Sequence, residues 1–129
     1  MTRGSNAPGR FMSKIPQLPL DGGFDYSKAD EVCQRIVETF RPERITVFGS
    51  VAKGLANEDS DLDMVVVMRT DLPYMERSVA IYGSIDELRM ATDILVFTPE
   101  EYDDGLRDGN TFIGRIDSEG VEVYALHTK

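Results

Sequence analysis

The stretch Gly49–Asp63, which reads GSVAKGLANEDSDLD, lies between two apolar runs, Ile45–Phe48 and Met64–Met68. Short runs of this kind predict a buried strand on each side of it. The glycines allow backbone N–H groups to approach a phosphate closely. Side chains two residues apart on a strand share a face, so Asp61 and Asp63 would project together and repel each other unless a cation lies between them. The stretch therefore predicts a nucleotide and metal site.

The length, charge and cysteine count of the chain exclude several classes of protein. The chain has 129 residues, which suits one domain, and its 23 acidic and 14 basic residues give a formal charge of -9. A nucleic-acid binder needs a clustered basic face, so no nucleic-acid partner is expected. No apolar stretch is long enough to cross a membrane. The single cysteine, Cys33, cannot form an internal disulfide, and we expect a cytoplasmic protein.

The first two dozen residues are punctuated by glycine and proline and show no sustained hydrophobic period. They lack the uninterrupted apolar core of a secretory signal, and Pro16 and Pro19 oppose the amphipathic helix of a transit peptide. We expect residues 1–24 to form a flexible tail, in part docked on the domain or on a partner. Residues 25–127 are expected to form one domain.

A first helix is predicted from Ser27, which can act as its N-cap, to Phe40, and Pro42 ends it. Its apolar residues follow the i, i+3, i+4, i+7 rhythm of one buried face. Cys33 lies on that face, so it is interpreted as a packed structural thiol rather than a nucleophile.

Three more helices are predicted in the second half of the chain. One begins at Asp71–Pro73, with the proline early in its first turn. Another begins at Thr98, followed by Pro, Glu and Glu, which is typical of a capped N-terminus. Gly105 and Gly109 are expected to separate it from a further short helix, and residues 117–120 are expected to turn the chain.

Four runs of β-forming residues predict strands, at residues 45–48, 62–68, 92–97 and 121–125. The alternation of these strands with helices indicates a small α/β (α+β) domain in which helices cover a short mixed β-sheet.

Two familiar motifs match the same residues only in part, and each lacks residues that it requires. Gly49–Gly54 has the glycine spacing of a P-loop, but Leu55–Ala56 replaces the lysine and the hydroxyl residue that such a loop requires. Asp59–Asp63 begins like an EF-hand calcium loop, but its sixth position would be Met64 and its twelfth Thr70, in place of Gly and Glu.

The full pattern, Gly-Ser-x-x-x-Gly-x(5)-Ser-Asp-x-Asp, resembles the minimal, MNT-type nucleotidyltransferases of the DNA polymerase β-like superfamily over roughly residues 25–125. The resemblance implies the nucleotidyltransferase (polymerase β palm) fold, with Gly49 and Ser50 contacting the triphosphate. Many relatives carry Arg where this chain has Val51. Lys53 is the candidate for the missing charge, with a solvated surface lysine as the alternative, and Ser60 completes the nucleotide-binding set.

The same resemblance assigns the carboxylates. Asp61 and Asp63 would bind Mg²⁺, and Asp93, which precedes the Thr-Pro-Glu-Glu helix start, matches the third family carboxylate, a general base that also lies at the metal. Carboxylate oxygens are ligands that Mg²⁺ prefers, and a carboxylate beside the metal can accept the proton of an attacking hydroxyl.

The resemblance implies a Mg²⁺-dependent nucleotidyltransferase that moves a nucleoside monophosphate, AMP from ATP, onto a hydroxyl. Minimal members of the family are commonly antitoxins paired with a small helical HEPN-domain toxin, so a HEPN-type partner is expected, and a homo-oligomer is possible. Two alternatives stay open. One is a catalytically weak module that neutralises its partner by complex formation, and the other is a small-molecule transferase like the antibiotic-modifying relatives.

Overall fold

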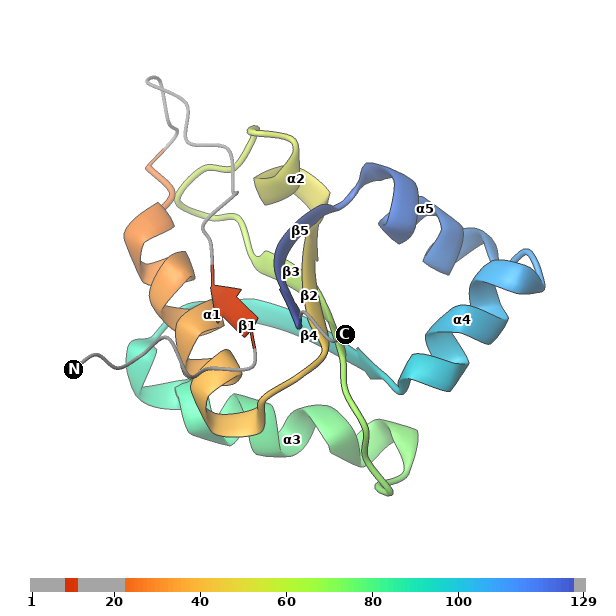
Figure 1. Ribbon diagram of the computed structural model, residues 1–129. Coiled ribbons are helices and arrows are strands. Elements are labelled where there is room, and N and C mark those ends of the chain that lie inside the picture. Colours follow the sequence, from red (N-terminus) through yellow and green to blue (C-terminus); the bar gives the residue numbers. More distant parts are fainter. Residues whose placement is uncertain (1–8, 12–22, 127–129) are drawn as a thin grey trace.

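The computed structural model of the protein describes residues 9–11, as backbone only, and residues 23–126 (Figure 1). Its centre is a five-stranded mixed sheet in the order β1-β5-β2-β3-β4. The strands are β1 (Gly9–Phe11), β2 (Arg44–Phe48), β3 (Leu62–Val67), β4 (Thr92–Phe97) and β5 (Val121–Leu126). The helices are α1 (Tyr26–Phe40), α2 (Gly49–Ala52), α3 (Tyr74–Ile85), η2 (Asp86–Leu88), α4 (Pro99–Arg107) and α5 (Thr111–Glu119). The predicted mixed sheet with covering helices is confirmed.

Strand pairing brings distant parts of the chain into register. β2 pairs antiparallel with β3, so that Phe48 lies opposite Asp63. β3 pairs parallel with β4, so that Asp63 lies beside Asp93. β5 pairs antiparallel with β2, and β1 adds an antiparallel edge strand to β5. The C-terminal end of β2 therefore lies beside the N-terminal ends of β3 and β4. We call this end of the strands one edge of the sheet.

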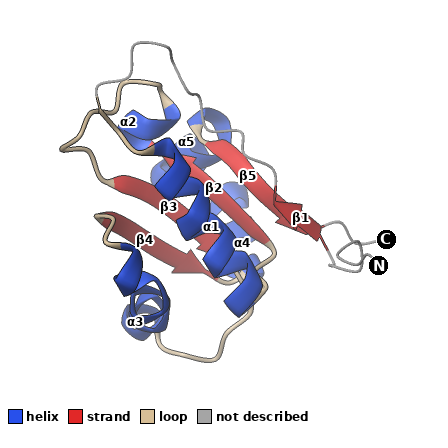
Figure 2. Cartoon of the chain, turned by 90° about the vertical axis from the view of Figure 1, so that its left-hand side faces the viewer, coloured by secondary structure: helices blue, strands red, loops and turns tan. Residues whose placement is uncertain are grey.

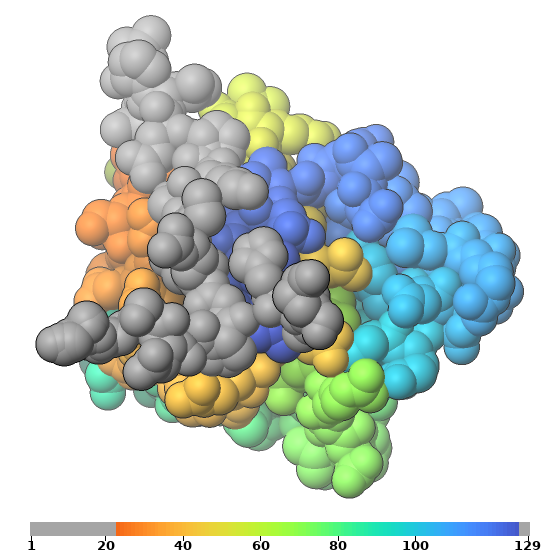
Figure 3. All heavy atoms as spheres, in the orientation of Figure 1, coloured from red at the N-terminus to blue at the C-terminus, as the bar shows by residue number. Residues whose placement is uncertain are grey.

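Two layers of helices enclose the sheet. In Figure 2, α1 lies in front of the strands and α4 and α5 lie behind them. The core between the sheet and α1 and α3 includes Met64 and Val66, whereas Val65 and Val67 pack on α4 and α5. Because side chains alternate along a strand, Asp63 lies on the same face as Val65, which is the α4–α5 face. Figure 3 shows α4 and α5 as a lobe at the right-hand side of the molecule.

The helix boundaries differ from the sequence predictions in four places. α3 begins at Tyr74, with Pro73 as its N-cap rather than in its first turn. Asp25 caps α1 in place of Ser27, because its carboxylate accepts the N–H of Lys28 at 2.9 Å. α4 continues through Gly105 to Arg107, and a Cβ at Gly105 would clash with Ile113, so this glycine lets α5 pack closely against α4. α5 continues to Glu119, where a turn had been predicted from residue 117.

Other local predictions are confirmed. Thr98 and Glu101 form the reciprocal capping box at the start of α4. Cys33 is fully buried in the core, and burial raises the pKa of its thiol to about 12, as a packed structural thiol requires.

The described residues include only part of the predicted tail and of the predicted domain boundaries. Residues 9–11, which lie within the predicted tail, form β1 and pair with β5. Phe24 also packs in the core, one residue before the predicted domain start. The remainder of the predicted tail up to residue 22, and residue 127 at the predicted end, lie outside the described residues. Within the described part of the chain, no helix is long and apolar enough to cross a membrane.

Candidate active site

Gly49 forms the sharp turn between β2 and α2. Its φ of 74° lies in the left-handed region, which residues with a Cβ rarely adopt. A Cβ at this position would clash with Oδ2 of Asp63 and lie 3.3 Å from its Cγ. The backbone of the turn therefore lies directly against the Asp63 carboxylate, and only glycine permits that approach.

Three aspartates gather at this edge of the sheet. Asp63 is half-buried at the start of β3, Asp93 is its register partner on β4, and Asp61 precedes Asp63 by two residues. The pKa of Asp63 is raised, first by burial and then by the negative charges of Asp93 and Asp61. The fold therefore places Asp63 close enough to Asp93 and Asp61 for their charges to act on its carboxyl group.

The carboxylates of Asp61, Asp63 and Asp93 have the chemistry that a divalent cation requires of its ligands. Carboxylate oxygens are hard ligands of the kind Mg²⁺ prefers, and a cation would relieve the repulsion that adds to burial in raising the pKa of Asp63. In their present rotamers, however, no three acidic, histidine or cysteine side chains of the described residues form a ready-made metal group. Asp61 and Asp93 are exposed, so their side chains are free of core packing that would prevent them from turning toward a shared ion.

Helix α2 and the loop that follows it carry the other residues predicted for the site. Val51 is fully buried and packs in the core, so the position where relatives carry Arg contributes no charge to the site here. Lys53 is exposed at the C-terminal end of α2. The Ser60 hydroxyl accepts the N–H of Asn57 at 2.8 Å and thereby closes the turn that leads into Asp61.

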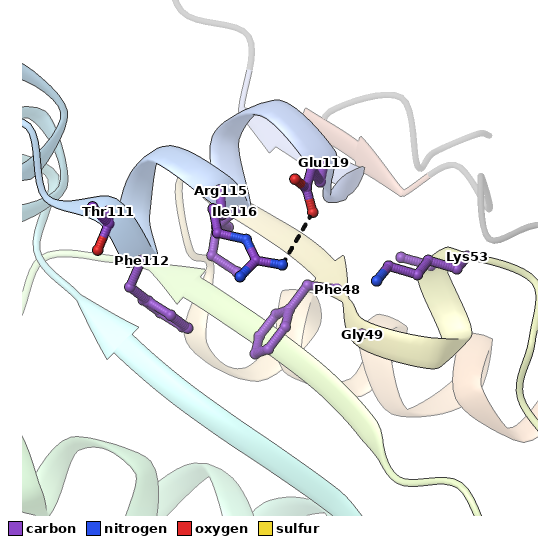
Figure 4. A pocket seen from close by; sticks show the side chains of 9 residues that line it. Phe48, Gly49, Lys53, Thr111, Phe112, Arg115, Ile116 and Glu119 are labelled. Atoms are coloured by element: carbon purple, nitrogen blue, oxygen red, sulfur yellow. Dashed lines mark ion pairs between the residues drawn. The ribbon is translucent and has the colours of Figure 1, made fainter.

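A cavity of about 430 Å³ lies beside the Gly49 turn, between α2 and α5 (Figure 4). Its lining includes two aromatic rings, the turn itself, two cations and one acid: Phe48, Phe112, Gly49, Lys53, Arg115 and Glu119. The two rings meet edge to face, with centroids 5.8 Å apart and an interplanar angle of 89°. Arg115 pairs with Glu119 at 3.6 Å. Figure 4 shows the Lys53 side chain reaching toward Arg115 across this space.

The sequence analysis did not assign Phe112 or Arg115 to the site. Phe112 and Ile113 are adjacent and point about 100° apart around the helix axis, so they face different neighbours. Ile113 is the buried one of the pair, which leaves Phe112 40% exposed at the cavity.

Comparison with known proteins agrees with this geometry. Residues 28–89 match the family model of the nucleotidyltransferase domain, a span that contains Gly49–Asp63 and ends before Asp93. The chain is 28% identical over 81 residues to a protein of Methanocaldococcus jannaschii named "putative protein adenylyltransferase", covering 63% of this chain and 78% of that protein.

The fold is also found in a solved structure. A "putative nucleotidyltransferase" from Sulfolobus solfataricus superposes with a TM-score of 0.52 and 22% identity, covering 74% of this chain and 76% of the other. At that identity the likeness shows the fold alone, which is the nucleotidyltransferase fold that the sequence predicted. The Gly49 turn, Asp61 and Asp63 therefore lie within the residues that match the nucleotidyltransferase family model, in a chain with the nucleotidyltransferase fold.

Proposed function

We propose that the protein transfers AMP from ATP to a hydroxyl group of a partner protein, with Mg²⁺ held by Asp61, Asp63 and Asp93. The observation that carries the proposal is the contact between the Gly49 turn and the Asp63 carboxylate, with Asp93 in register beside it. A phosphate held by the backbone of that turn would lie next to the carboxylates. The name of the Methanocaldococcus jannaschii relative supports the choice of a protein acceptor and an adenylyl group.

Each residue has a defined part in this reaction. The backbone of Gly49 and Ser50 would bind the phosphates, assisted by the Lys53 ammonium, and Ser60 would hold the loop that presents Asp61. Asp93 would accept the proton of the attacking hydroxyl. The hydroxyl oxygen forms a bond to the α-phosphorus while the bond to the pyrophosphate oxygen breaks, so AMP moves to the acceptor and pyrophosphate leaves. Mg²⁺, when bound, would neutralise charge on the phosphates.

The acceptor half of the site is proposed to lie on another molecule. The described residues form one sheet with its covering helices and contain no separate acceptor-binding domain. We propose a small helical HEPN-type protein in the cytoplasm as the partner, with this chain acting as its antitoxin by modifying it, either as a monomer or as a homo-oligomer.

Transfer of label tests the proposal. ATP labelled at the α-phosphate, Mg²⁺ and a candidate HEPN-type partner should label the partner, whereas ATP labelled at the γ-phosphate should not. Asp61→Ala/Asp63→Ala should abolish the labelling. Asp103→Ala/Asp108→Ala removes the same charge from exposed positions on and just after α4 and should leave it intact. Unchanged labelling by the Asp61/Asp63 variant would reject the assignment.

A second candidate, a module that neutralises its partner by binding alone, is favoured by two observations. Val51 leaves the turn without the usual arginine, and no three metal-binding side chains of the described residues are already converged. In that case Asp61→Ala/Asp63→Ala should still form the complex and still suppress the partner's activity. Replacing the partner by hydroxylated antibiotics in the labelling assay tests the small-molecule alternative.

A further inference from the structure

The cavity between α2 and α5 opens directly from the candidate active site. Gly49 lines the cavity and also contacts the Asp63 carboxylate. A molecule that occupies the cavity therefore extends from the position proposed for the phosphates. Its volume of about 430 Å³ falls in the range of small-ligand pockets.

The lining of the cavity favours an aromatic ligand over a phosphate chain. Phe48 and Phe112 present rings to it, and Ala52 and Ile116 add apolar surface. Phe112 is 40% exposed, so one part of its ring has no protein neighbour. A phosphate chain makes no use of such surface, whereas a nucleobase can stack on it.

Charged groups lie at the border of the same cavity. Lys53 lies on the side of α2 and Arg115 on the side of α5 (Figure 4). The Arg115–Glu119 pair, at 3.6 Å between exposed side chains, contributes little to stability. Arg115 can therefore leave Glu119 without a large cost and place its planar guanidinium against a base or near a phosphate.

We infer that this cavity is the nucleoside subsite of the enzyme: the base of the nucleotide stacks on Phe112 and its ribose leads back to the Gly49 turn. The inference rests on the proposed nucleotidyl transfer and adds residues of α5 to the site. Phe112 is the binding residue that carries it, and Arg115 borders the same space.

The chain contains no tryptophan, which provides a direct probe. Phe112→Trp introduces a single tryptophan into the cavity, and its emission can be excited selectively over that of the five tyrosines. Its emission should be quenched saturably by ATP with Mg²⁺ and should not respond to inorganic tripolyphosphate. Leu106→Trp is the matched control, because Leu106 lies on α4 outside the cavity lining with a nearly equal exposure of 39%, and its emission should not change with either ligand.

Binding measured by calorimetry completes the test. Phe112→Ala should weaken ATP binding by about 5- to 150-fold, the range for loss of one base-stacking aromatic ring, and leave tripolyphosphate binding unchanged. Phe112→Leu, which keeps an apolar side chain without a ring, should behave in the same way, and Leu106→Ala should bind ATP normally.

The outcomes separate this inference from the proposed function. If the wild-type chain binds ATP and both Phe112 variants bind it equally well, the nucleoside lies elsewhere while nucleotidyl transfer stands. Equal loss of ATP and tripolyphosphate binding in the Phe112 variants would also overturn the subsite, because the ring would then act on the phosphates or on the fold. A wild-type chain that binds no ATP would overturn the proposed function together with the subsite.

Discussion

Replacing Gly49 with alanine tests the contact on which the site depends. The substitution acts in two ways. It places a Cβ on a residue whose φ is 74°, and it directs that Cβ into the Asp63 carboxylate. The first effect lowers stability, and the second moves a proposed metal ligand. A control that shows only the first effect is therefore needed.

Gly109 provides that control. Its φ is 79°, and a Cβ there would meet nothing within 4 Å. An alanine in this backbone region costs about 1–2 kcal/mol. For a domain of this size that corresponds to a fall of about 3–10 °C in Tm. Gly109→Ala and Gly49→Ala should both show such a fall. The Gly49 variant loses little more, because the obstructing oxygen is the end of a side chain that can rotate.

The two variants should differ sharply in activity. Rotation of the Asp63 side chain away from a Cβ at residue 49 displaces its carboxylate by about an ångström, and misplacement of that size can cost about 100-fold in rate. We therefore expect Gly49→Ala to lose about 100-fold in transfer of α-labelled AMP and Gly109→Ala to keep wild-type activity, with thermal unfolding followed by circular dichroism for both. If Gly49→Ala transfers AMP as fast as Gly109→Ala, the Gly49–Asp63 contact has no part in the reaction.

Two further predictions concern the scaffold. Arg77 is buried and donates to both Glu101 carboxylate oxygens, at 2.6 and 3.1 Å, and to the carbonyl of Leu72 at 2.9 Å. Arg77→Ala should lower the free energy of unfolding in urea by about 1–3 kcal/mol, since it leaves the buried carbonyl oxygen of Val96, which accepts from Arg77 at 3.3 Å, without its partner. Arg77→Lys should recover only part of that loss, and a change below 1 kcal/mol for Arg77→Ala would show that the pair is dispensable. Because burial raises the pKa of Cys33 to about 12, its thiol should not react with Ellman's reagent at pH 8 in the native protein. Above about pH 9 the unfolded thiol ionises first, so stability should fall as the pH rises toward 12, and rapid native-state labelling at pH 8 would contradict this packing.

The sequence was informative where local chemistry determines structure. The start of α4 follows from Thr98 and Glu101 alone, because a capping box is formed by neighbouring residues. The apolar runs around Gly49–Asp63 became β2 and β3 because their residues are buried in the sheet, as such runs usually are. These elements position the turn and two of the three carboxylates.

Features that depend on the packing of the folded chain were harder to predict from the sequence. Asp25 rather than Ser27 caps α1. Both residue types make good N-caps, so the sequence alone does not choose between them. Gly105 was read as a helix breaker, yet it lies inside α4 because Ile113 needs the space that a Cβ would take. The cavity combines residues of α2 and α5 that are about sixty positions apart, so no local pattern could indicate it.

The placement of Asp93 shows most clearly what the fold adds to the sequence. Side chains alternate with a period of two along a strand, so a slip of one residue between β3 and β4 would turn Asp93 to the α1–α3 face, away from Asp63. The observed register, Asp63 beside Asp93, also sets Ile94 beside Met64 and Val96 beside Val66 in the core. Burial of these four apolar side chains therefore holds two like charges next to each other at the edge of the sheet. Burial raises the pKa of Asp63, and that repulsion raises it further; hydrophobic packing sustains the repulsion and a bound cation would relieve it.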